Sequence, residues 1–184
     1  MVGERWSVIV IEVFKFCPRC GRPMVEAARR VCSDPACGFV QRTNPTPAIG
    51  ALVELDGEII LARNVLWPEG WFALITGYLE AGEEPTAAVV REVKEELSLD
   101  VVAVHPIGNY IFERKNEVML CYHVVAAGEV KLGAELCDYR RYKPHELKPW
   151  PRATGFAVAD WMKARGLPFE FVDFPGAADY LRRR

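Results

Sequence analysis

The sequence has no apolar run that approaches the ~18 residues a membrane-spanning helix needs. One apolar stretch near the N-terminus, Trp6–Val13, is short and is interrupted by Glu12, and it lacks the basic start and the small-residue cleavage site of an export signal. We therefore expect a β-strand there, a cytoplasmic protein and no membrane partner. Because thiols stay reduced in the cytoplasm, the six cysteines suggest metal ligands or buried thiols before disulfides.

The chain also lacks an excess of either charge. Lys and Arg number 23 against 25 Asp and Glu, so the formal net charge is -2. Non-specific binding of nucleic acid needs a basic excess, so no nucleic-acid partner is expected. There are no internal repeats or low-complexity segments, and 184 residues suffice for one ordinary domain with a small appendage.

Apolar patterning predicts strands in two runs around one helix, with a second helix near the C-terminus. The Asp56-Gly57 pair between two apolar runs indicates a hairpin, and Pro85 suits the first turn of a helix. This pattern predicts a mixed α/β sandwich with strands at 5–14, 48–55, 58–62, 100–104, 107–113, 117–126 and 138–143, a short strand ending at Thr76, and helices at 85–97 and 153–165.

Three carboxylates share one face of the first predicted helix. At ~100° per residue, Glu92, Glu95 and Glu96 fall within an arc of ~100°. Val90, Val93 and Leu97 fall on another face, which we expect to pack against a sheet. Like charges one turn apart destabilise a helix. A solvated acidic face is the alternative, but hard divalent cations with oxygen ligands are a physical reason to keep such a cluster.

The spacing around this helix resembles the Nudix box, G-x5-E-x7-R-E-U-x-E-E-x-G-U, where U is aliphatic. All specified positions match except one, where Ser98 stands in place of glycine. Glycine at this position readily takes the left-handed conformation that ends a helix, so the conformation at the end of this helix is in doubt. The matching residues are Gly77, Glu83, Arg91, Glu92, Val93, Glu95, Glu96 and Leu99.

The resemblance implies a Nudix-type α/β/α sandwich with a mixed sheet, and hydrolysis of a diphosphate assisted by Mg²⁺ or Mn²⁺. Glu92 and Glu96 are the strongest ligand candidates, followed by Glu95 and the Gly77 carbonyl. Glu83 and Arg91 would brace the loop against the helix. The general base stays open among the box glutamates and the later loops.

Four of the six cysteines form two close pairs near the N-terminus, which suits a tetrahedral structural zinc. A redox dithiol is the rival for the first pair, but it leaves the second unexplained. The ligands would be Cys17, Cys20, Cys32 and Cys37.

A ribbon that begins Phe16-Cys17-Pro and closes into Asn44-Pro45 is similar to the zinc-ribbon Nudix group, which includes NADH pyrophosphatases and enzymes acting on ADP-ribose or FAD. The resemblance covers about residues 16–165. We expect an N-terminal strand and zinc ribbon over 1–44 and a Nudix hydrolase domain over 45–184.

The predicted substrate is a small nucleotide of the ADP-ribose or FAD type. NADH pyrophosphatases carry an SQPWPFPxS motif that His105–Arg114 lacks, so NADH is an alternative. A catalytically silent ligand sensor is another, although such domains usually lose box carboxylates. Arg63 and Tyr78 are candidate substrate contacts and Glu135 a further magnesium ligand, and the resemblance leaves room for a homodimer.

Overall fold

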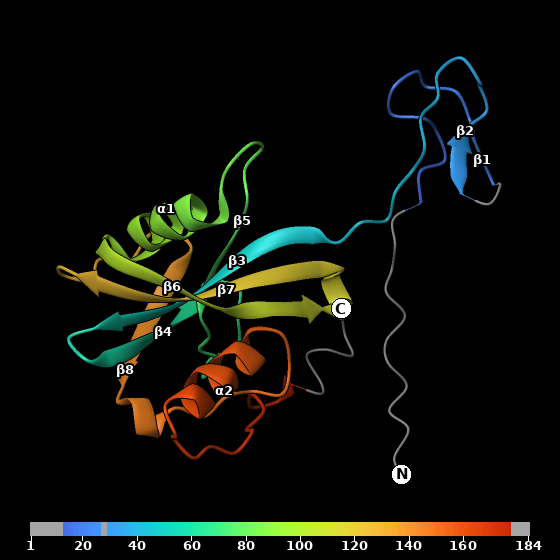
Figure 1. Ribbon diagram of the computed structural model, residues 1–184. Helices are drawn as coiled ribbons and strands as arrows, with labels where there is room; N and C mark the ends of the chain where they lie inside the picture. The colour runs from blue at the N-terminus through green and yellow to red at the C-terminus, as the bar shows by residue number, and fades with distance from the viewer. Residues whose placement is uncertain (1–12, 27–28, 178–184) are drawn as a thin grey trace, which may run out of the picture. The chain divides into compact units, whose positions relative to one another are not determined.

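The computed structural model describes residues 13–26 and 29–177, which form two compact units (Figure 1). Among the described residues, one unit comprises 13–26 and 29–46 with Glu113–Asn116, which contains the short 3-10 helix η1 (Glu113–Lys115). The other comprises Pro47–Phe112 and 117–177. The strand predicted at 5–14 lies outside the described residues except for its last two. No helix of the described residues is long and apolar enough to span a membrane.

The smaller unit is built on one hairpin and a very small core. Strands β1 (Met24–Glu26) and β2 (Arg30–Cys32) pair antiparallel. Its buried apolar residues are Cys17, Met24 and Cys32, with Cys37 and Phe39 packed against them. Because so few apolar side chains are buried, this core contributes little stability by itself.

The larger unit contains a mixed sheet in the order β6-β7-β3-β4-β8, with β5 paired to β3 off this path. Neighbouring strands β3 and β7 run in the same direction, whereas β3 with β4 and β6 with β7 are antiparallel (Figure 1). The strands are β3 (Thr46–Leu55), β4 (Glu58–Asn64), β5 (Ile75–Tyr78), β6 (Asp100–Phe112), β7 (Glu117–Ala127) and β8 (Leu136–Tyr142).

The predicted Asp-Gly hairpin is present between β3 and β4. Leu55 pairs with Glu58, so only Asp56 and Gly57 form the turn. Both have positive φ, 53° and 78°, as a type I′ turn requires.

Side-chain alternation along β3 gives the sheet two apolar faces, each covered by a helix (Figure 1). Ile49, Ala51, Val53 and Leu55 pack in one core with helix α1 (Pro85–Leu97). Leu52 packs on the other side with helix α2 (Thr154–Ala164). The fold is therefore the predicted α/β/α sandwich. A short 3-10 helix, η2 (Pro144–Glu146), lies between β8 and α2.

The predicted packing face of α1 is wrong by one residue. Val93 and Leu97 are fully buried as expected, but Val90 is 43% exposed and Val89 takes its place in the core. Residues 89, 93 and 97 are spaced by four, whereas 90, 93 and 97 mix spacings of three and four. Both spacings place residues on one face of a helix, so the pattern alone did not choose between them.

The two strands predicted at 100–104 and 107–113 are one strand, β6, with register shifts between Val101 and Ala103 and between Pro106 and Gly108. A proline cannot donate to the ladder and is tolerated in edge strands and bulges. Pro106 meets both conditions, because β6 is the edge strand of the sheet order and Pro106 lies at its second register shift.

Candidate metal and diphosphate site

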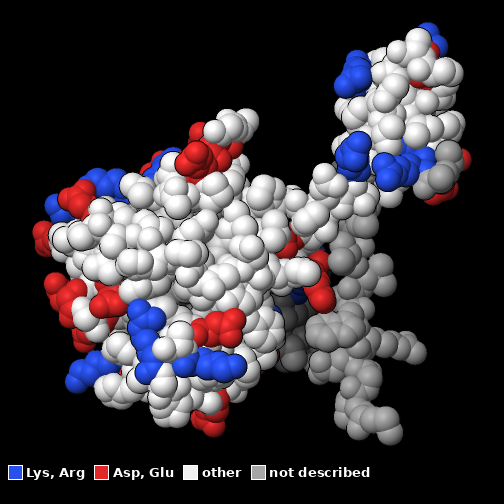
Figure 2. All heavy atoms as spheres, viewed as in Figure 1, with Lys and Arg blue, Asp and Glu red and all other residues white. Residues whose placement is uncertain are grey.

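The segment between β5 and α1 is tied to the helix by one arginine. The Arg91 guanidinium donates two hydrogen bonds of 2.9 Å to the Glu83 carboxylate and one of 3.1 Å to the Tyr78 carbonyl oxygen. Glu83 also accepts the Glu80 backbone N–H. Hydrogen bonds from Arg91, then from Glu80, lower the pKa of Glu83 to about 2. The structure thus brings the two predicted support residues, Glu83 and Arg91, together. Figure 2 shows acidic side chains on this loop.

Glu92 and Glu96 lie on the inner side of α1, only 9% and 8% exposed, while the Glu95 side chain is 59% exposed. Arg91 donates to Glu92 at 2.6 Å and to Glu95 at 3.2 Å. Among the described residues, Glu96 has no side-chain hydrogen-bond partner. Burial raises the pKa of Glu92. Burial, followed by the charges of Glu92, Glu135 and Glu95, raises the pKa of Glu96 to about 8.

Gly77 is required by the position of Glu92. A Cβ atom at residue 77 would lie 1.9 Å from Glu92 Oε1, which is far inside van der Waals contact. The absence of a side chain therefore lets the end of β5 lie directly against the carboxylate.

The loop over 128–135 covers the C-terminal end of α1. Backbone N–H groups of Lys131 and Gly133 donate to the Leu97 and Glu96 carbonyl oxygens, which have no partner within the helix. A Cβ atom on Gly133 would lie 2.5 Å from the Glu95 carbonyl oxygen, so only glycine fits this close approach. The loop then carries Glu135 near enough to raise the pKa of both Glu92 and Glu96. The sequence analysis named Glu135 as a candidate ligand but did not single out Gly133, which stands two residues before it.

The side chains of the two predicted substrate contacts both lie on the α2 face of the sheet, opposite the glutamate cluster. Tyr78 is half-exposed, and its side chain lies on the α2 face, because it pairs with Ala48, which packs with Ala157 of α2. Its hydroxyl donates a 2.5 Å hydrogen bond to the buried Glu117 carboxylate, which is the main reason that its pKa rises to about 12. Arg63 lies two residues after Leu61 in β4 and therefore shares its face, which packs in the α2 core. The structure therefore does not bring either side chain to the glutamates.

The glutamate cluster fits a hard divalent cation by the chemistry of its donors, since Mg²⁺ and Mn²⁺ prefer carboxylate and carbonyl oxygens. Within the described parts of the chain, only the four cysteines have ligand atoms that all lie within 4.8 Å of one another. The glutamate oxygens are therefore less convergent, which suits a cation that takes several ligands from water and substrate.

The four cysteines converge on one point. The sulfur atoms of Cys17 and Cys37 are 3.7 Å apart and those of Cys20 and Cys32 are 3.5 Å apart. These separations are too long for a disulfide and close to the ~3.8 Å between ligands of a tetrahedral zinc with Zn–S bonds of ~2.3 Å.

The backbone around the cysteines forms two similar turns. Gly21 and Gly38 directly follow the second cysteine of each pair and have φ of 74° and 65°, in the region that favours glycine. Burial acts to raise the pKa of Cys17, but hydrogen bonds from the Arg19 and Cys20 backbones and from neighbouring thiols outweigh it and lower this pKa to about 7. The pKa of Cys32 is raised to about 12 against the lowering effect of the Asp34 backbone hydrogen bond, and burial raises the pKa of Cys37. Of these three thiols, only Cys17 is therefore shifted toward the thiolate, the form that binds metal.

Comparisons with known proteins agree with this geometry. The family model described as the NUDIX domain matches residues 44–161. The NAD-capped RNA hydrolase NudC of Pseudomonas putida is 29% identical over 166 residues, 88% of this chain and 60% of the relative. That of Pseudomonas aeruginosa is 32% identical over 146 residues, 78% of this chain and 52% of the relative. The chain thus spans little more than half the length of these curated relatives.

Solved structures share the fold at low sequence identity. The crystal structure of a NUDIX hydrolase from Nitrosomonas europaea has a TM-score of 0.67 and 20% identity, covering 87% of this chain and 99% of that one. An ADP-ribose pyrophosphatase from Streptococcus suis has a TM-score of 0.54 and 20% identity, covering 70% and 100%.

The raised pKa of Glu96 makes the metal-free protein sensitive to pH. Its folded-state pKa of about 8 exceeds the ordinary 4.5, so the folded state holds the proton more tightly. The protonated Glu96 side chain therefore stabilises the folded state. This stabilisation is fully present below pH 4.5 and is lost as the pH rises through about 8. Because Gln mimics the protonated group, we expect wild type to lose melting temperature relative to Glu96→Gln from pH 5 to 8.5, at about 2–4 °C per kcal/mol.

Adding Mg²⁺ at pH 8.5 should raise the melting temperature of wild type much more than that of Glu96→Gln. A melting-temperature difference that stays constant across the pH range, with no selective effect of Mg²⁺, would contradict this account of Glu96.

The cysteine geometry predicts about one zinc per chain in protein purified without chelator, measured by elemental mass spectrometry. Cys37→Ser should lower the zinc content and loosen the smaller unit, which has little core of its own. Cys137→Ser is the matched control, because this exposed cysteine lies outside the cluster. Absence of zinc, with the four clustered thiols reacting as fast as Cys137, would refute the assignment.

Proposed function

Because this chain belongs to the Nudix family, we propose that it hydrolyses the diphosphate linkage of an adenine dinucleotide with Mg²⁺ or Mn²⁺. The observation that carries the proposal is the pair of buried carboxylates, Glu92 and Glu96, placed against Gly77 and next to Glu135 without enough positive charge to balance them. Burying unpaired charge is costly, and a divalent cation removes that cost.

Glu92, Glu96 and Glu135, together with the Gly77 carbonyl, would hold the cation, and the exposed Glu95 would extend the ligand set toward solvent. When bound, such a cation neutralises the diphosphate oxygens and lowers the pKa of a water molecule. A carboxylate of the cluster accepts the proton as the water oxygen bonds to phosphorus, and the bridging P–O bond breaks to release two phosphate monoesters. Glu92, Glu95, Glu96 and the loop residue Glu135 are the candidates for this base.

Arg91 is a positioning residue in this scheme and does not itself contact the substrate. Its guanidinium is occupied by three carboxylates and the Tyr78 carbonyl, so it orients Glu92 and the loop and leaves little capacity for a phosphate. Zinc, held by the four cysteines of the smaller unit, would be structural.

A nicotinamide adenine dinucleotide is the substrate that we propose first. The names of the relatives support the NADH alternative over the ADP-ribose or FAD preference predicted from sequence. The missing SQPWPFPxS motif implies that this chain recognises the dinucleotide through other residues.

The same linkage occurs when the dinucleotide forms the 5′ end of an RNA, which the relatives are named for hydrolysing. The expectation of no nucleic-acid partner rested on net charge, and recognition confined to the capping dinucleotide requires no basic excess. An NAD-capped oligonucleotide is therefore one arm of the test.

We expect Mg²⁺-dependent turnover in a panel of NADH, NAD-capped RNA, ADP-ribose and FAD, with NADH hydrolysed fastest. Glu96→Gln should lower turnover at least ~100-fold, the scale for loss of a preorganised electrostatic group. Glu129→Gln, an exposed glutamate in the 128–135 loop, should retain full activity. Silence across the whole panel would favour the ligand-sensor alternative, and near-normal turnover of folded Glu96→Gln at saturating Mg²⁺ would refute the site.

Glu135 is tested through metal dependence. Glu135→Gln removes one oxygen charge and leaves the loop backbone unchanged, so the Mg²⁺ concentration for half-maximal turnover should rise about tenfold, with partial rescue at high Mg²⁺. Zinc content and folding should stay as in wild type, and Glu129→Gln is again the matched control. An unchanged Mg²⁺ requirement would remove Glu135 from the ligand set.

A further inference from the structure

A cavity of about 420 Å³ lies between the C-terminal half of α2 and strands β6 and β7. The residues that line this histidine cavity are His105, Pro106, Ile107, His123, Asp160, Trp161, Ala164 and Arg165. It lies on the α2 face of the sheet, since His123 alternates with Tyr122 and Val124, which pack in the α1 core. The glutamate cluster belongs to α1 on the other face, so the reaction described above does not use this cavity.

Some charged groups of the cavity have hydrogen-bond partners of opposite charge or polarity in the described part of the chain, and others do not. Both carboxylates nearby are already engaged: Asp160 accepts the Tyr110 hydroxyl at 2.7 Å, and Glu54 pairs with His123 at 2.7 Å. Arg165, by contrast, has no acidic partner within the described ranges, and its guanidinium lies 4.0 Å from the Trp161 ring centroid. His105 likewise has no acidic partner among those residues. Two nitrogen donors are therefore available to an anion.

Flat rings make up much of the remaining wall. His105 and His123 are cross-strand partners whose rings stack at 5.9 Å and 22°, and the His123 ring lies 5.5 Å from that of Trp161. Burial lowers the pKa of His123, although its hydrogen bond to Glu54 acts to raise it. Flat rings and a guanidinium stacked on indole favour another planar ring.

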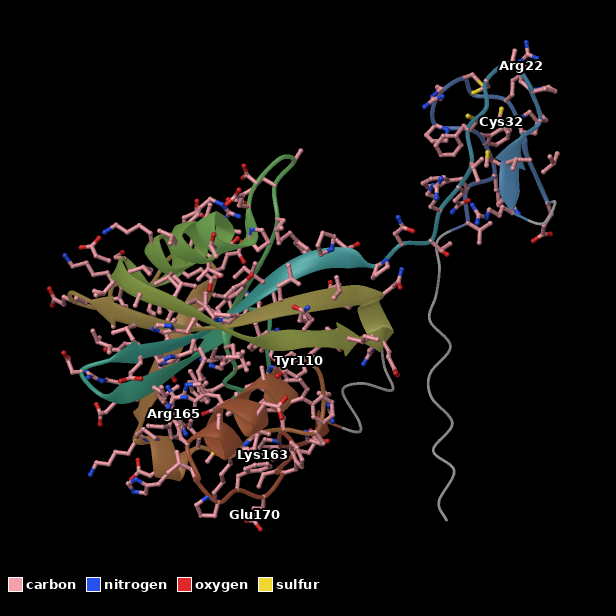
Figure 3. The ribbon with its side chains drawn as sticks, in the orientation of Figure 1. Arg22, Cys32, Tyr110, Lys163, Arg165 and Glu170 are labelled. Atoms are coloured by element: carbon pink, nitrogen blue, oxygen red, sulfur yellow. The ribbon has the colours of Figure 1, made fainter. Side chains whose placement is uncertain are left out.

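We propose that the histidine cavity binds a small aromatic anion of the nucleoside monophosphate class. Arg165 and His105 provide donors for the phosphate, and the stacked rings provide a surface for the base. The volume is near the lower end for ligand pockets, which fits a mononucleotide better than a dinucleotide. Figure 3 labels Arg165 at this end of α2.

The three histidines of the chain make the test direct, because two lie in the cavity and His145 lies in η2, outside it. We would titrate the zinc-containing protein with AMP, adenosine and inorganic phosphate in buffer without Mg²⁺, and follow the imidazole signals by heteronuclear NMR. AMP should shift His105 and His123 at lower concentration than either fragment and leave His145 in place. A His145→Gln variant identifies the control signal.

Arg165→Gln should weaken AMP binding at the two shifted signals at least ~10-fold, because it removes a charge-assisted hydrogen bond. Lys163→Gln removes the same charge two residues earlier, where a helical side chain points elsewhere, and should bind as wild type. Unshifted His105 and His123, equal shifts of all three histidines, or equal affinities of the two variants would overturn the proposal. Inorganic phosphate that matches AMP would overturn the requirement for a ring.

Discussion

The Arg91 guanidinium is the contact on which the catalytic half of the molecule depends. It reaches Glu83 in the preceding loop, Glu92 and Glu95 on its own helix, and the backbone of Tyr78 at the end of β5. One planar group with five donors can hold a strand end, a loop and a helix in a single register, and a lysine cannot reproduce this geometry. The placement of Glu92 against Gly77 follows from that register.

Arg91 does not neutralise the cluster that it positions. Glu96 is buried with no partner among the described residues, and Glu135 adds a further negative charge. In the metal-free protein this arrangement costs stability, as shown by the raised pKa of Glu96. The rest of the unit offsets that cost through two extensive apolar cores, one on each face of the sheet. A site that stores unfavourable charge in this way binds a cation more tightly than a fully compensated site would.

Features encoded within a few adjacent residues were predictable from the sequence. These include the Asp56-Gly57 turn, the start of α1 at Pro85 and the Glu83–Arg91 brace. Ser98, where the family pattern has glycine, adopts the left-handed conformation anyway, with φ of 60°. Its hydroxyl donates to the Lys131 carbonyl oxygen at 3.1 Å, which offsets part of the ~1 kcal/mol strain and involves a loop 33 residues away.

Features set by distant contacts were not predictable in this way. Val89 replaces Val90 in the core because the sheet, rather than the helix, selects the buried face. Arg63 lies on the α2 face because of its position in the β4 alternation. Gly133 and the histidine cavity arise only when loops and strands far apart in the chain come together. The convergence of the four cysteines could be predicted because cysteine pairs are a strong signal even at wide spacing.

The most direct test of the central claim is anomalous diffraction at the manganese edge from crystals equilibrated with Mn²⁺. The account predicts a strong manganese peak bounded by the carboxylates of Glu92 and Glu96 and by the Gly77 carbonyl oxygen. A well-ordered crystal at saturating Mn²⁺ with no peak in this cluster, or with manganese bound only elsewhere, would contradict it.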